Sequence, residues 1–337
     1  MKFSIKQIAA QAGVSTATVD RVLNQRPGVR YHTEQRVLAA QQELEEQSGL
    51  AGFRGRRFYF DVIVQAPERF TAAVRQAMLD VIPTMQPFRI QPRFHLMETI
   101  ELPSLQKLIQ NCSATGSQGV ILKAPDNPVI NDAVAGLAAV EVPVVTLVTD
   151  LPYSKRIAYV GIDNRAAGAT AAYLLAQWLG QQPVTVAVVL SSDRFRGEEE
   201  REIGFRQLLR QRYPHISLVE VSGGQGIYRD TFKLMVEALK ADYSICAVYS
   251  VGGGNQSILD AFDAEKRPLR AFIGHDLDEE NRALLLSHKI DALIDHNLQE
   301  DVRRCFLHIL GYQRAITFDS GASSKINVLT PYSVAGA

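Results

Sequence analysis

Short apolar runs rich in β-branched residues alternate with amphipathic stretches from residue 59 onward. A loop and then a helical pattern follow each run, which is typical of βαβ units around a parallel sheet. At 337 residues the chain is long enough for two or three compact domains. We therefore predict an α/β fold for most of the chain. The predicted buried strands are residues 59–65, 119–124, 142–150, 184–192, 244–251 and 269–276.

Polar side chains follow several of these strands, at the edge where open parallel sheets bind ligands. An acid at a strand end can simply cap the next helix, but several such groups converge here. Carboxylates and amides bind paired hydroxyls, and an arginine can donate several hydrogen bonds. With three acids against one or two bases, we expect a neutral sugar or polyol; Phe70 and Tyr228 either stack on it or pack in the core. The candidate residues are Gln65, Asp150, Asp193, Arg201, Asn255 and Asp276.

The first fifty residues predict three short helices. Apolar residues at positions 5, 8, 9 and 12 share one helical face, Gly13 can end that helix, and Ser15 can cap the next one. Residues 24–28 break the chain before a third helix from about residue 33 to 46. This pattern fits a helix-turn-helix, although an ordinary three-helix packing unit has the same spacing. The short side chains that begin the second helix favour DNA, since they allow close approach to the major groove, where Arg21 can reach O6 and N7 of guanine.

The net charge of the chain is zero, but the charge is unevenly distributed. Residues 1–57 hold nine Lys and Arg against five Asp and Glu, which leaves +4 there and −4 on the remainder. A basic N-terminal unit concentrates the attraction for phosphate at one end of the molecule. This distribution favours a nucleic-acid partner, while a charge of this size is also common on small domains.

The motifs of other functional classes are missing from the sequence. There is no P-loop, GxSxG or HExxH motif, and the glycine-rich residues 251–257, VGGGNQS, lack the spacing of a dinucleotide-binding loop. The three cysteines and seven histidines show no ligand spacing. We therefore expect no catalysis, no cofactor and no metal. Because no apolar run approaches a bilayer span and no signal-peptide pattern begins the chain, we expect a cytoplasmic protein rather than the exported sugar-binding component of a transport system.

Residues 5–24, IKQIAAQAGVSTATVDRVLN, resemble the headpiece of the LacI/GalR family of bacterial repressors. The shared features are Ala-Gly-Val-Ser, Thr-Val-x-Arg-Val and the asparagine that follows. The resemblance implies that Thr16, Ala17 and Arg21 read base edges. It also implies a second set of residues that hold phosphates and set the register without reading sequence. This set is Ser15, Thr18, Asn24, Arg30 and Thr33, with Lys6 where the family often has a DNA-facing side chain.

Two features depart from the family pattern. Asp20 stands where the family usually has serine, so its carboxylate either accepts from a cytosine amino group or pairs with a neighbour such as Arg21 or Lys6. The linker at residues 48–57 lacks the Asn-x-x-Ala motif of the family's hinge helix and has glycines at 49, 52 and 55. Two interpretations of this linker remain open. Either its arginines contact the minor groove or the DNA backbone, or the segment is a flexible basic tether; the arginines are Arg54, Arg56 and Arg57.

The chain from about residue 60 to 330 resembles the LacI/GalR effector domain, which is itself similar to periplasmic sugar-binding proteins. The resemblance is strongest in VPVVTLVTDLP, YVGIDNRAAGATAAYLL, REIGFRQLL and FIGHDL. It implies two lobes joined by three crossovers, and such lobes close on a ligand by hinge motion.

Particular effector residues follow from the same resemblance. Arg201, three places before Gly204-Phe205, and Asp276 match the family's effector arginine and aspartate. His296 lies on the predicted strand 292–298, where the chain recrosses near the pocket, and Asn255 belongs to a Gly-Gly-Gly-Asn loop. At Val148 many relatives carry an acid, so either Asp150 substitutes for it or the ligand differs.

The predicted organisation is a three-helix helix-turn-helix headpiece followed by a two-lobed α/β effector domain of the periplasmic-binding-protein type. The domain boundaries are 1–47 for the headpiece, 48–58 for the linker, 59–161 with 296–318 for the N-terminal lobe, and 162–295 with 319–334 for the C-terminal lobe. The predicted function is a DNA-binding transcriptional repressor whose operator affinity is controlled by a sugar or polyol between the lobes. A single helix-turn-helix buries little surface on DNA, so we expect a homodimer or tetramer. The alternative is a non-transport sugar-binding or dimerising protein whose body senses no ligand.

Overall fold

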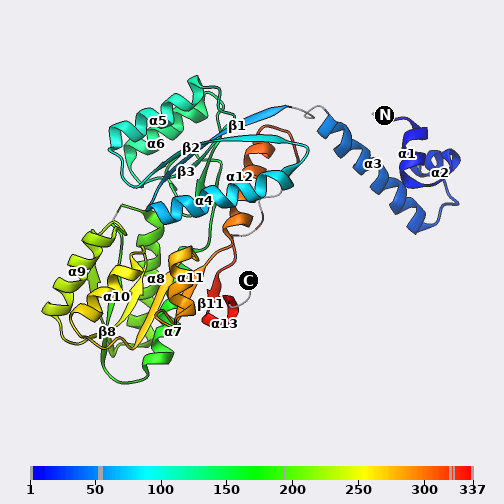
Figure 1. Cartoon of the computed structure of the whole chain (residues 1–337). Helices are drawn as coiled ribbons and strands as arrows, with labels where there is room; N and C mark the ends of the chain where they lie inside the picture. Colours follow the sequence, from blue (N-terminus) through cyan, green and yellow to red (C-terminus); the bar gives the residue numbers. More distant parts are fainter. Residues whose placement is uncertain (1–2, 52–55, 193, 319–320, 322, 335–337) are drawn as a thin grey trace.

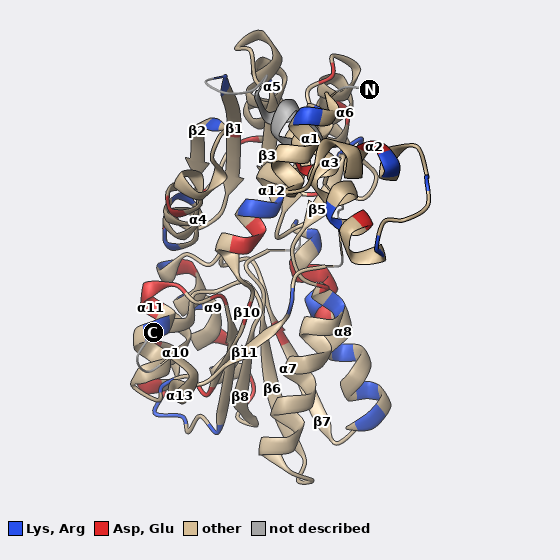
Figure 2. Cartoon of the chain, turned by 90° about the vertical axis from the view of Figure 1, so that its right-hand side faces the viewer, with Lys and Arg blue, Asp and Glu red and all other residues tan. Residues whose placement is uncertain are grey.

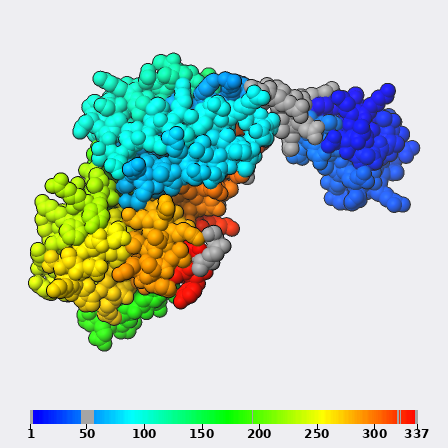
Figure 3. Space-filling model, in the orientation of Figure 1, coloured from blue at the N-terminus to red at the C-terminus, as the bar shows by residue number. Residues whose placement is uncertain are grey.

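The computed structural model describes residues 3–51, 56–192, 194–318, 321 and 323–334, with the backbone alone for residues 45–51. Figure 1 shows a small helical headpiece at the N-terminus and two α/β lobes. In Figure 3 the two lobes pack against each other to form one body. Within the described ranges, no helix combines the length and the apolar character that a membrane span requires.

The headpiece consists of three helices, α1 Ile5–Ala12, α2 Thr16–Leu23 and α3 Tyr31–Ala51. Gly13 ends α1 in the left-handed conformation (φ 62°), and the Ser15 side chain caps α2 by accepting from the Thr18 amide. The helix α3 is longer than predicted, because residues 47–51 continue it. The two weak helix formers in that stretch, Ser48 and Gly49, disfavour a helix by at most about 1 kcal/mol each, which is too little to end it. Each helix contributes a buried residue to the common core: Ile8, Val19 and Val37.

The N-terminal lobe is built on a five-stranded parallel sheet in the order β2-β1-β3-β4-β5. Its strands are β1 Arg57–Gln65, β2 Arg89–Met97, β3 Gly119–Lys123, β4 Val144–Leu147 and β5 Ala158–Val160. The covering helices are α4 Glu68–Val81, the 3-10 turn η1 Ile82–Met85, α5 Leu102–Ala114, α6 Pro128–Ala139 and α12 Leu298–Tyr312. The helix α12 returns from the other lobe, and its Phe306 packs on Phe60 of β1 with ring centroids 5.8 Å apart.

The C-terminal lobe has a six-stranded sheet in the order β11-β10-β9-β8-β6-β7, parallel except for β11. Its strands are β6 Val184–Val189, β7 Ile216–Val221, β8 Ile245–Ser250, β9 Ala271–His275, β10 Ala292–Asp295 and β11 Asn327–Leu329. Its helices are α7 Asn164–Leu179, α8 Arg196–Arg212, α9 Tyr228–Ala241, α10 Asn255–Ala264, α11 Glu279–Leu286 and α13 Pro331–Val334.

The chain crosses between the lobes three times, after β5, after β10 and after α12. The prediction of an α/β fold with a helical headpiece is confirmed, and each of the seven predicted strands, residues 292–298 included, overlaps a strand of one of the two sheets. Four strands were not predicted. The edge strand β2 carries arginine, glutamine, proline and histidine, which a partly exposed edge tolerates. The strand β7 is also an edge strand, and β5 and β11 have three residues each, too few for a recognisable pattern.

Candidate functional site

The outward face of α2 presents three exposed residues that the sequence singled out as base readers. Thr16, Ala17 and Arg21 are exposed, whereas Val19 and Val22 of the same helix are buried. In Figure 2 the blue ribbon segments mark Lys and Arg positions on α2 and on the loop that follows it. A protruding helix with short side chains at its start and an arginine one turn on has the shape and charge to enter a major groove.

An arginine from α3 fixes the turn between α1 and α2. Nη2 of Arg36 donates to the carbonyl oxygen of Ala12 at 2.6 Å. A β-carbon at Gly13 would lie 3.1 Å from the same Nη2, so the glycine both provides the left-handed turn and leaves room for the guanidinium. The angle between α1 and α2 is therefore held by the third helix.

Asp20 pairs with two residues that follow it in the headpiece. Its Oδ2 lies 3.0 Å from Nη1 of Arg26, and its Oδ1 accepts from Nδ2 of Asn24 at 2.8 Å. The predicted pairing of Asp20 with a neighbour is thus confirmed, but the partner is Arg26 and not Arg21 or Lys6, because the loop after α2 folds back and brings Arg26 to the carboxylate. The same Asn24 amide also donates to the Asp20 carbonyl oxygen at 2.9 Å. Both amide hydrogens of Asn24 are therefore engaged within the headpiece.

The remaining DNA candidates surround this helix. Thr18 and Thr33 are half-buried, and the hydroxyls of Ser15 and Thr18 lie 2.9 Å apart. In the linker, the guanidinium of Arg56 lies 5.2 Å from the Phe58 ring centroid, and Arg57 begins β1. Arg54 lies outside the described residues. The exposed candidates are Lys6, Ser15, Asn24 and Arg30.

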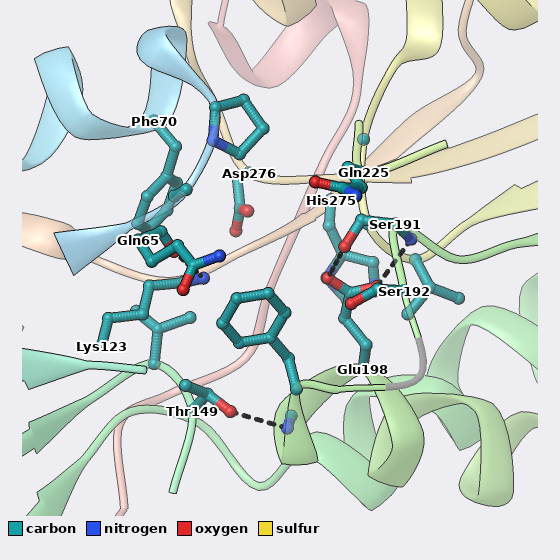
Figure 4. Close-up of a pocket in the computed structure, with 18 of the residues that line it drawn as sticks. Gln65, Phe70, Lys123, Thr149, Ser191, Ser192, Glu198, Gln225, His275 and Asp276 are labelled. Atoms are coloured by element: carbon teal, nitrogen blue, oxygen red, sulfur yellow. Dashed lines mark hydrogen bonds between the residues drawn. The ribbon is translucent and has the colours of Figure 1, made fainter. Parts of the chain in front are cut away.

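The second site is a cavity between the lobes, at the carboxyl ends of β1, β3, β4, β6, β8 and β9. Its volume is about 80 Å³. Figure 4 shows Gln65 and Lys123 on one side, Ser191 and Glu198 on the other, and Asp276 between them. The strand ends of both lobes thus supply polar groups to one cavity, as expected for open parallel sheets.

Asp276 is the central acid of this cavity. It follows β9 with a left-handed φ of 66°, and Val148 at the end of β4 has the same unusual φ. A β-branched residue in this region is strained, and such strain concentrates at functional sites. Burial raises the pKa of Asp276. The neighbouring His296 and Arg201 lower it by more than burial raises it, so that the pKa lies well below its usual range. The carboxylate therefore remains ionised.

Several buried polar atoms at this site have no hydrogen-bond partner among the described residues. They include Oε1 of Gln65, Oδ1 of Asp276 and Nδ1 of His275. His275 uses its Nε2 in a 2.8 Å hydrogen bond with the Tyr249 hydroxyl, and burial keeps its pKa well below the ordinary value, so the ring is neutral. Because buried polar groups are rarely left unpaired, these atoms indicate a polar ligand.

Arg201 is positioned by contacts with two other segments, α7 and the end of β8. Its Nε donates to Oδ1 of Asn164 at 2.8 Å and its Nη1 to the Val251 carbonyl oxygen at 3.2 Å. The helix α8 that carries it crosses α7 very closely, because a β-carbon at Gly168 would lie 1.9 Å from the Arg201 carbonyl oxygen. The motif REIGFRQLL therefore places one guanidinium in the cavity wall through helix packing.

Charges in the cavity wall balance, whereas the sequence predicted three acids against one or two bases. The difference arises because charged residues that were not among the sequence candidates also line the cavity. Burial lowers the pKa of one such residue, Lys123, to about 8, against the opposing effect of Glu198 and Asp276. Its Nζ lies 4.2 Å from the Phe195 ring centroid and 5.6 Å from that of Phe70. The charged lining residues are Arg69, Lys123, Arg194 and Arg201, and Glu98, Glu198, Asp276 and Asp278.

Two family models match the chain. Residues 4–45 match the model of bacterial regulatory proteins of the lacI family. Residues 101–306, more than half of the chain, match the model of the periplasmic binding protein domain. The chain belongs to the lacI family of bacterial regulatory proteins, and its body is a periplasmic binding protein domain. It is accordingly a DNA-binding transcriptional regulator with an effector domain.

Solved structures share the fold of this lacI-family regulator. A glucose-galactose binding protein from Geobacillus stearothermophilus has a TM-score of 0.73 and 17% identity, covering 83% of this chain and 99% of its own. A candidate LacI transcriptional regulator from Bacteroides fragilis has a TM-score of 0.73 and 15% identity, covering 83% and 98%. An ABC transporter solute-binding protein from Burkholderia graminis in complex with D-arabinose has a TM-score of 0.74 and 17% identity, covering 83% and 97%. No curated protein matches the regulator by sequence.

Three effector residues predicted from sequence line the cavity of the regulator: Gln65, Arg201 and Asp276. Asn255 lies behind the wall, where its Nδ2 donates to Oδ1 of Asn281 at 2.7 Å. His296 also lies behind the wall, with Nε2 3.6 Å from Oδ1 of Asp276 and Nδ1 2.5 Å from Oδ2 of Asp301. These two residues support cavity residues and do not line the cavity itself.

Asp150 does not reach the effector cavity. Its carboxylate is bound by the Arg156 guanidinium and by the Thr146 hydroxyl, which donates to Oδ1 at 2.9 Å. The acid after β4 therefore stabilises its own loop. Tyr228 is exposed and donates to Asp260 at 2.6 Å, and Asp193 lies outside the described residues.

Other cavity residues of the regulator were not predicted. Both oxygens of Glu198 accept from Ser191, at 2.7 Å from its amide and 2.5 Å from its hydroxyl. The Thr149 hydroxyl accepts from the Gly197 amide at 2.9 Å. Ser191 and Thr149 belong to predicted strand ends, so the strand-end rule could have found them, whereas Glu198 has no sequence signal of its own.

Proposed function

We propose that this regulator binds a neutral monosaccharide or similar polyol between its lobes, and that binding changes the affinity of its headpieces for an operator. The observation that carries the proposal is the ionised, buried carboxylate of Asp276, whose Oδ1 accepts no hydrogen bond in the described part of the chain and lies 3.6 Å from Nε2 of His296. Gln65 adds a second free acceptor, Oε1. Free buried acceptors are best matched by the hydroxyl donors of a sugar.

Charge and size support a small neutral ligand. Four basic and four acidic side chains line the cavity, so that a ligand with net charge would leave one of them uncompensated. The cavity volume of about 80 Å³ equals roughly five to eight sites of the ~10–15 Å³ that one water needs. This is the scale of a monosaccharide. The sugar-binding proteins among the structural relatives support the same ligand class.

The proposed roles follow from position. Asp276 and Gln65 accept from hydroxyls, and Arg201 and Lys123 donate to ring or hydroxyl oxygens. His296 holds the Asp276 carboxylate in place and compensates its charge. The rings of Phe70 and Phe195, which both line the cavity, supply apolar surface to the sugar.

The proposed DNA contacts use the exposed face of α2. Arg21 reads a guanine, and Thr16 and Ala17 contact neighbouring base edges. The residues around the helix bind phosphates. Asn24 is not one of them, because its amide donates to Asp20 and shapes the loop. The proposed phosphate contacts are Lys6, Ser15, Thr18, Arg30 and Thr33.

We further propose that the regulator acts in the cytoplasm as a repressor, with two headpieces of a homodimer on a pseudo-palindromic operator. One headpiece contacts too few base pairs to select a unique site, so two must act together. Closure of the lobes on the ligand would alter the spacing of the two linkers and hence operator affinity.

A thermal-shift screen with a panel of aldoses, ketoses and alditols tests the ligand, because a compound that binds the folded state raises the melting temperature by mass action. The decisive variant is Asp276→Asn, which removes the charge while asparagine tolerates the left-handed φ. We expect it to abolish the shift while operator binding in a gel-shift assay is retained.

The matched control is Asp230→Asn, an exposed acid on α9, which should leave the thermal shift unchanged. A wild-type protein that binds a selected operator but responds to no compound in the panel would support the alternative, a body that senses no sugar. Loss of operator binding in Asp276→Asn would instead assign that residue to folding.

A further inference from the structure

The Gly-Gly-Gly-Asn loop at residues 252–255 has a role that no ligand contact explains. Its second glycine, Gly253, has a φ of 89° and faces an arginine from the opposite lobe. A β-carbon at this position would lie 1.9 Å from Nη2 of Arg69, so that a side chain here would displace the guanidinium. The absence of a side chain at Gly253 therefore lets the guanidinium lie against the backbone of the C-terminal lobe.

Arg69 stands in the first turn of α4, directly after β1 of the N-terminal lobe. Its Nη1 donates to the carbonyl oxygen of Gly226 at 3.2 Å. Its Nε lies 3.1 Å from Oδ2 of Asp278. Both partners belong to the C-terminal lobe, so that one side chain joins three segments of that lobe, at Gly226, Gly253 and Asp278.

The carboxylate of Asp278 is oriented toward the Arg69 guanidinium by its own hydrogen bond. Its Oδ1 accepts from the Asn281 amide at 2.7 Å and so caps α11, while Oδ2 faces Arg69. The side chain of Asp278 is 7% exposed and that of Arg69 is 24% exposed, so the ion pair is well shielded from solvent. Breaking a shielded pair leaves a buried charge uncompensated, which is strongly unfavourable.

We propose that Arg69 is an interlobe latch, docked in a cradle of Gly226, Gly253 and Asp278, that holds the two lobes closed over the cavity. Arg69 also lines the cavity, so the latch closes the same space that the effector would occupy. Two further contacts between the lobes are uncharged hydrogen bonds: the Asp126 amide donates to the Arg194 carbonyl oxygen at 3.1 Å, and the Gly197 amide donates to the Thr149 hydroxyl at 2.9 Å. Gly253 is thus explained by an arginine of the opposite lobe, and Gly252 by its own lobe, since a β-carbon there would lie 2.3 Å from the Ser191 amide nitrogen; neither glycine requires a phosphate. This proposal does not depend on the identity of the effector.

The test is the distance between nitroxide labels on the two lobes of the full-length chain, measured by pulsed electron resonance with no compound added. Gln110→Cys on α5 and Arg210→Cys on α8 are exposed labelling positions, with Cys246→Ser to remove background labelling; Cys112 and Cys305 are buried. In this background, Arg69→Ala and Asp278→Asn should move the distribution to longer distances by more than its parental width. Asparagine at 278 can still cap α11, so that this variant removes the ion pair alone.

Gly253→Ala should open the lobes to a similar extent, and combining it with Arg69→Ala should add no further lengthening, because both changes remove the same contact. Arg75→Ala is the matched control: Arg75 is an exposed arginine on the same helix, beside Phe94 of its own lobe, and its loss should leave the distribution unchanged. Circular dichroism confirms folding, and if Gly253→Ala unfolds, the other two variants decide. Distributions for Arg69→Ala and Asp278→Asn that superimpose on the parent overturn the latch.

Discussion

Individual charged residues of the recognition helix have separate tasks. Asp20 is bound by Arg26 and Asn24 within the headpiece, so that its negative charge is already compensated in the absence of DNA. Arg21, one position on, is exposed at the outer face. The arginine is therefore the charged side chain of α2 that is placed for a base contact.

Replacing Arg21 by alanine should weaken binding to the preferred operator by roughly 1–3 kcal/mol and relax the preference at one base pair. The physical reason is the loss of a bidentate contact to guanine. Binding to a library of operator variants measures both effects. An unchanged base preference would show that Arg21 contacts only the DNA backbone.

A buried histidine, His296, connects the cavity residue Asp276 to Asp301 of α12. Burial lowers the pKa of His296, but the Asp276 carboxylate 3.6 Å away and the hydrogen-bonded Asp301 carboxylate outweigh this and raise the pKa to about 10. Its stabilising contribution is thus complete below the unfolded pKa of about 6.5 and is lost as pH rises toward 10. Lys123, with its pKa lowered to about 8, has the opposite sign in part of this range, since its charged form is disfavoured in the folded state.

Comparison with His296→Gln isolates the histidine contribution, because Lys123 is common to both proteins. Between about pH 6.5 and 10, wild-type stability should fall relative to the variant, by on the order of 1 kcal/mol per pH unit. Urea unfolding at a series of pH values measures the difference. Parallel stability profiles would mean that His296 is neutral in the folded protein.

At the level of elements, the crossing of α7 and α8 positions the effector arginine. Gly168 permits the crossing, since a β-carbon there would lie 1.9 Å from the Arg201 carbonyl oxygen. A similar approach occurs at Gly204, where a β-carbon would lie 2.1 Å from the Arg165 carbonyl oxygen. Because these neighbours are backbone atoms, any added side chain must separate the helices.

Gly168→Ala should destabilise the protein by about 1–3 kcal/mol through overpacking, and weaken effector binding because Arg201 moves with its helix. Gly136→Ala in α6 is the control, because its β-carbon would meet no atom within 4 Å. That variant should be neutral or more stable by up to about 1 kcal/mol, since alanine favours helices. Denaturant unfolding and the sugar-induced thermal shift report the two effects. Equal stability of the two variants would contradict the close-crossing argument.

At the scale of the whole molecule, the charge is divided between the parts. Residues 1–57 carry +4 and the remainder −4. The DNA phosphates therefore attract the headpiece end of the regulator and repel its body. The effector cavity is instead balanced between basic and acidic side chains. DNA binding and effector binding should therefore respond differently to salt.

Operator affinity should fall steeply with salt, and Arg30→Ala should reduce the log–log slope by about 1, because one phosphate contact is lost. Sugar binding should change little over the same range, since the ligand is neutral. Fluorescence anisotropy with labelled operator and calorimetry with the sugar measure the two dependences. An unchanged slope for Arg30→Ala would remove that residue from the phosphate contacts.

The sequence alone determined most of the elements and the class of both parts. The apolar periodicity of residues 5–12 and the β-rich runs after residue 59 are local properties, and a helix or strand follows from them before any long-range contact forms. The strands β5 and β11 were not predicted because three residues are too few to show a repeating apolar pattern.

Only the tertiary structure decided which polar residues face the cavity. Asp150 and Asp276 both follow predicted strands, yet one is held by Arg156 and the other faces the space between the lobes. Arg69 and Lys123 carry no motif, and their roles arise because segments far apart in sequence meet across the cleft. The sequence gives the chemistry of each side chain. Its partners depend on how the two lobes pack, and this packing rests on long-range contacts that no local sequence pattern encodes.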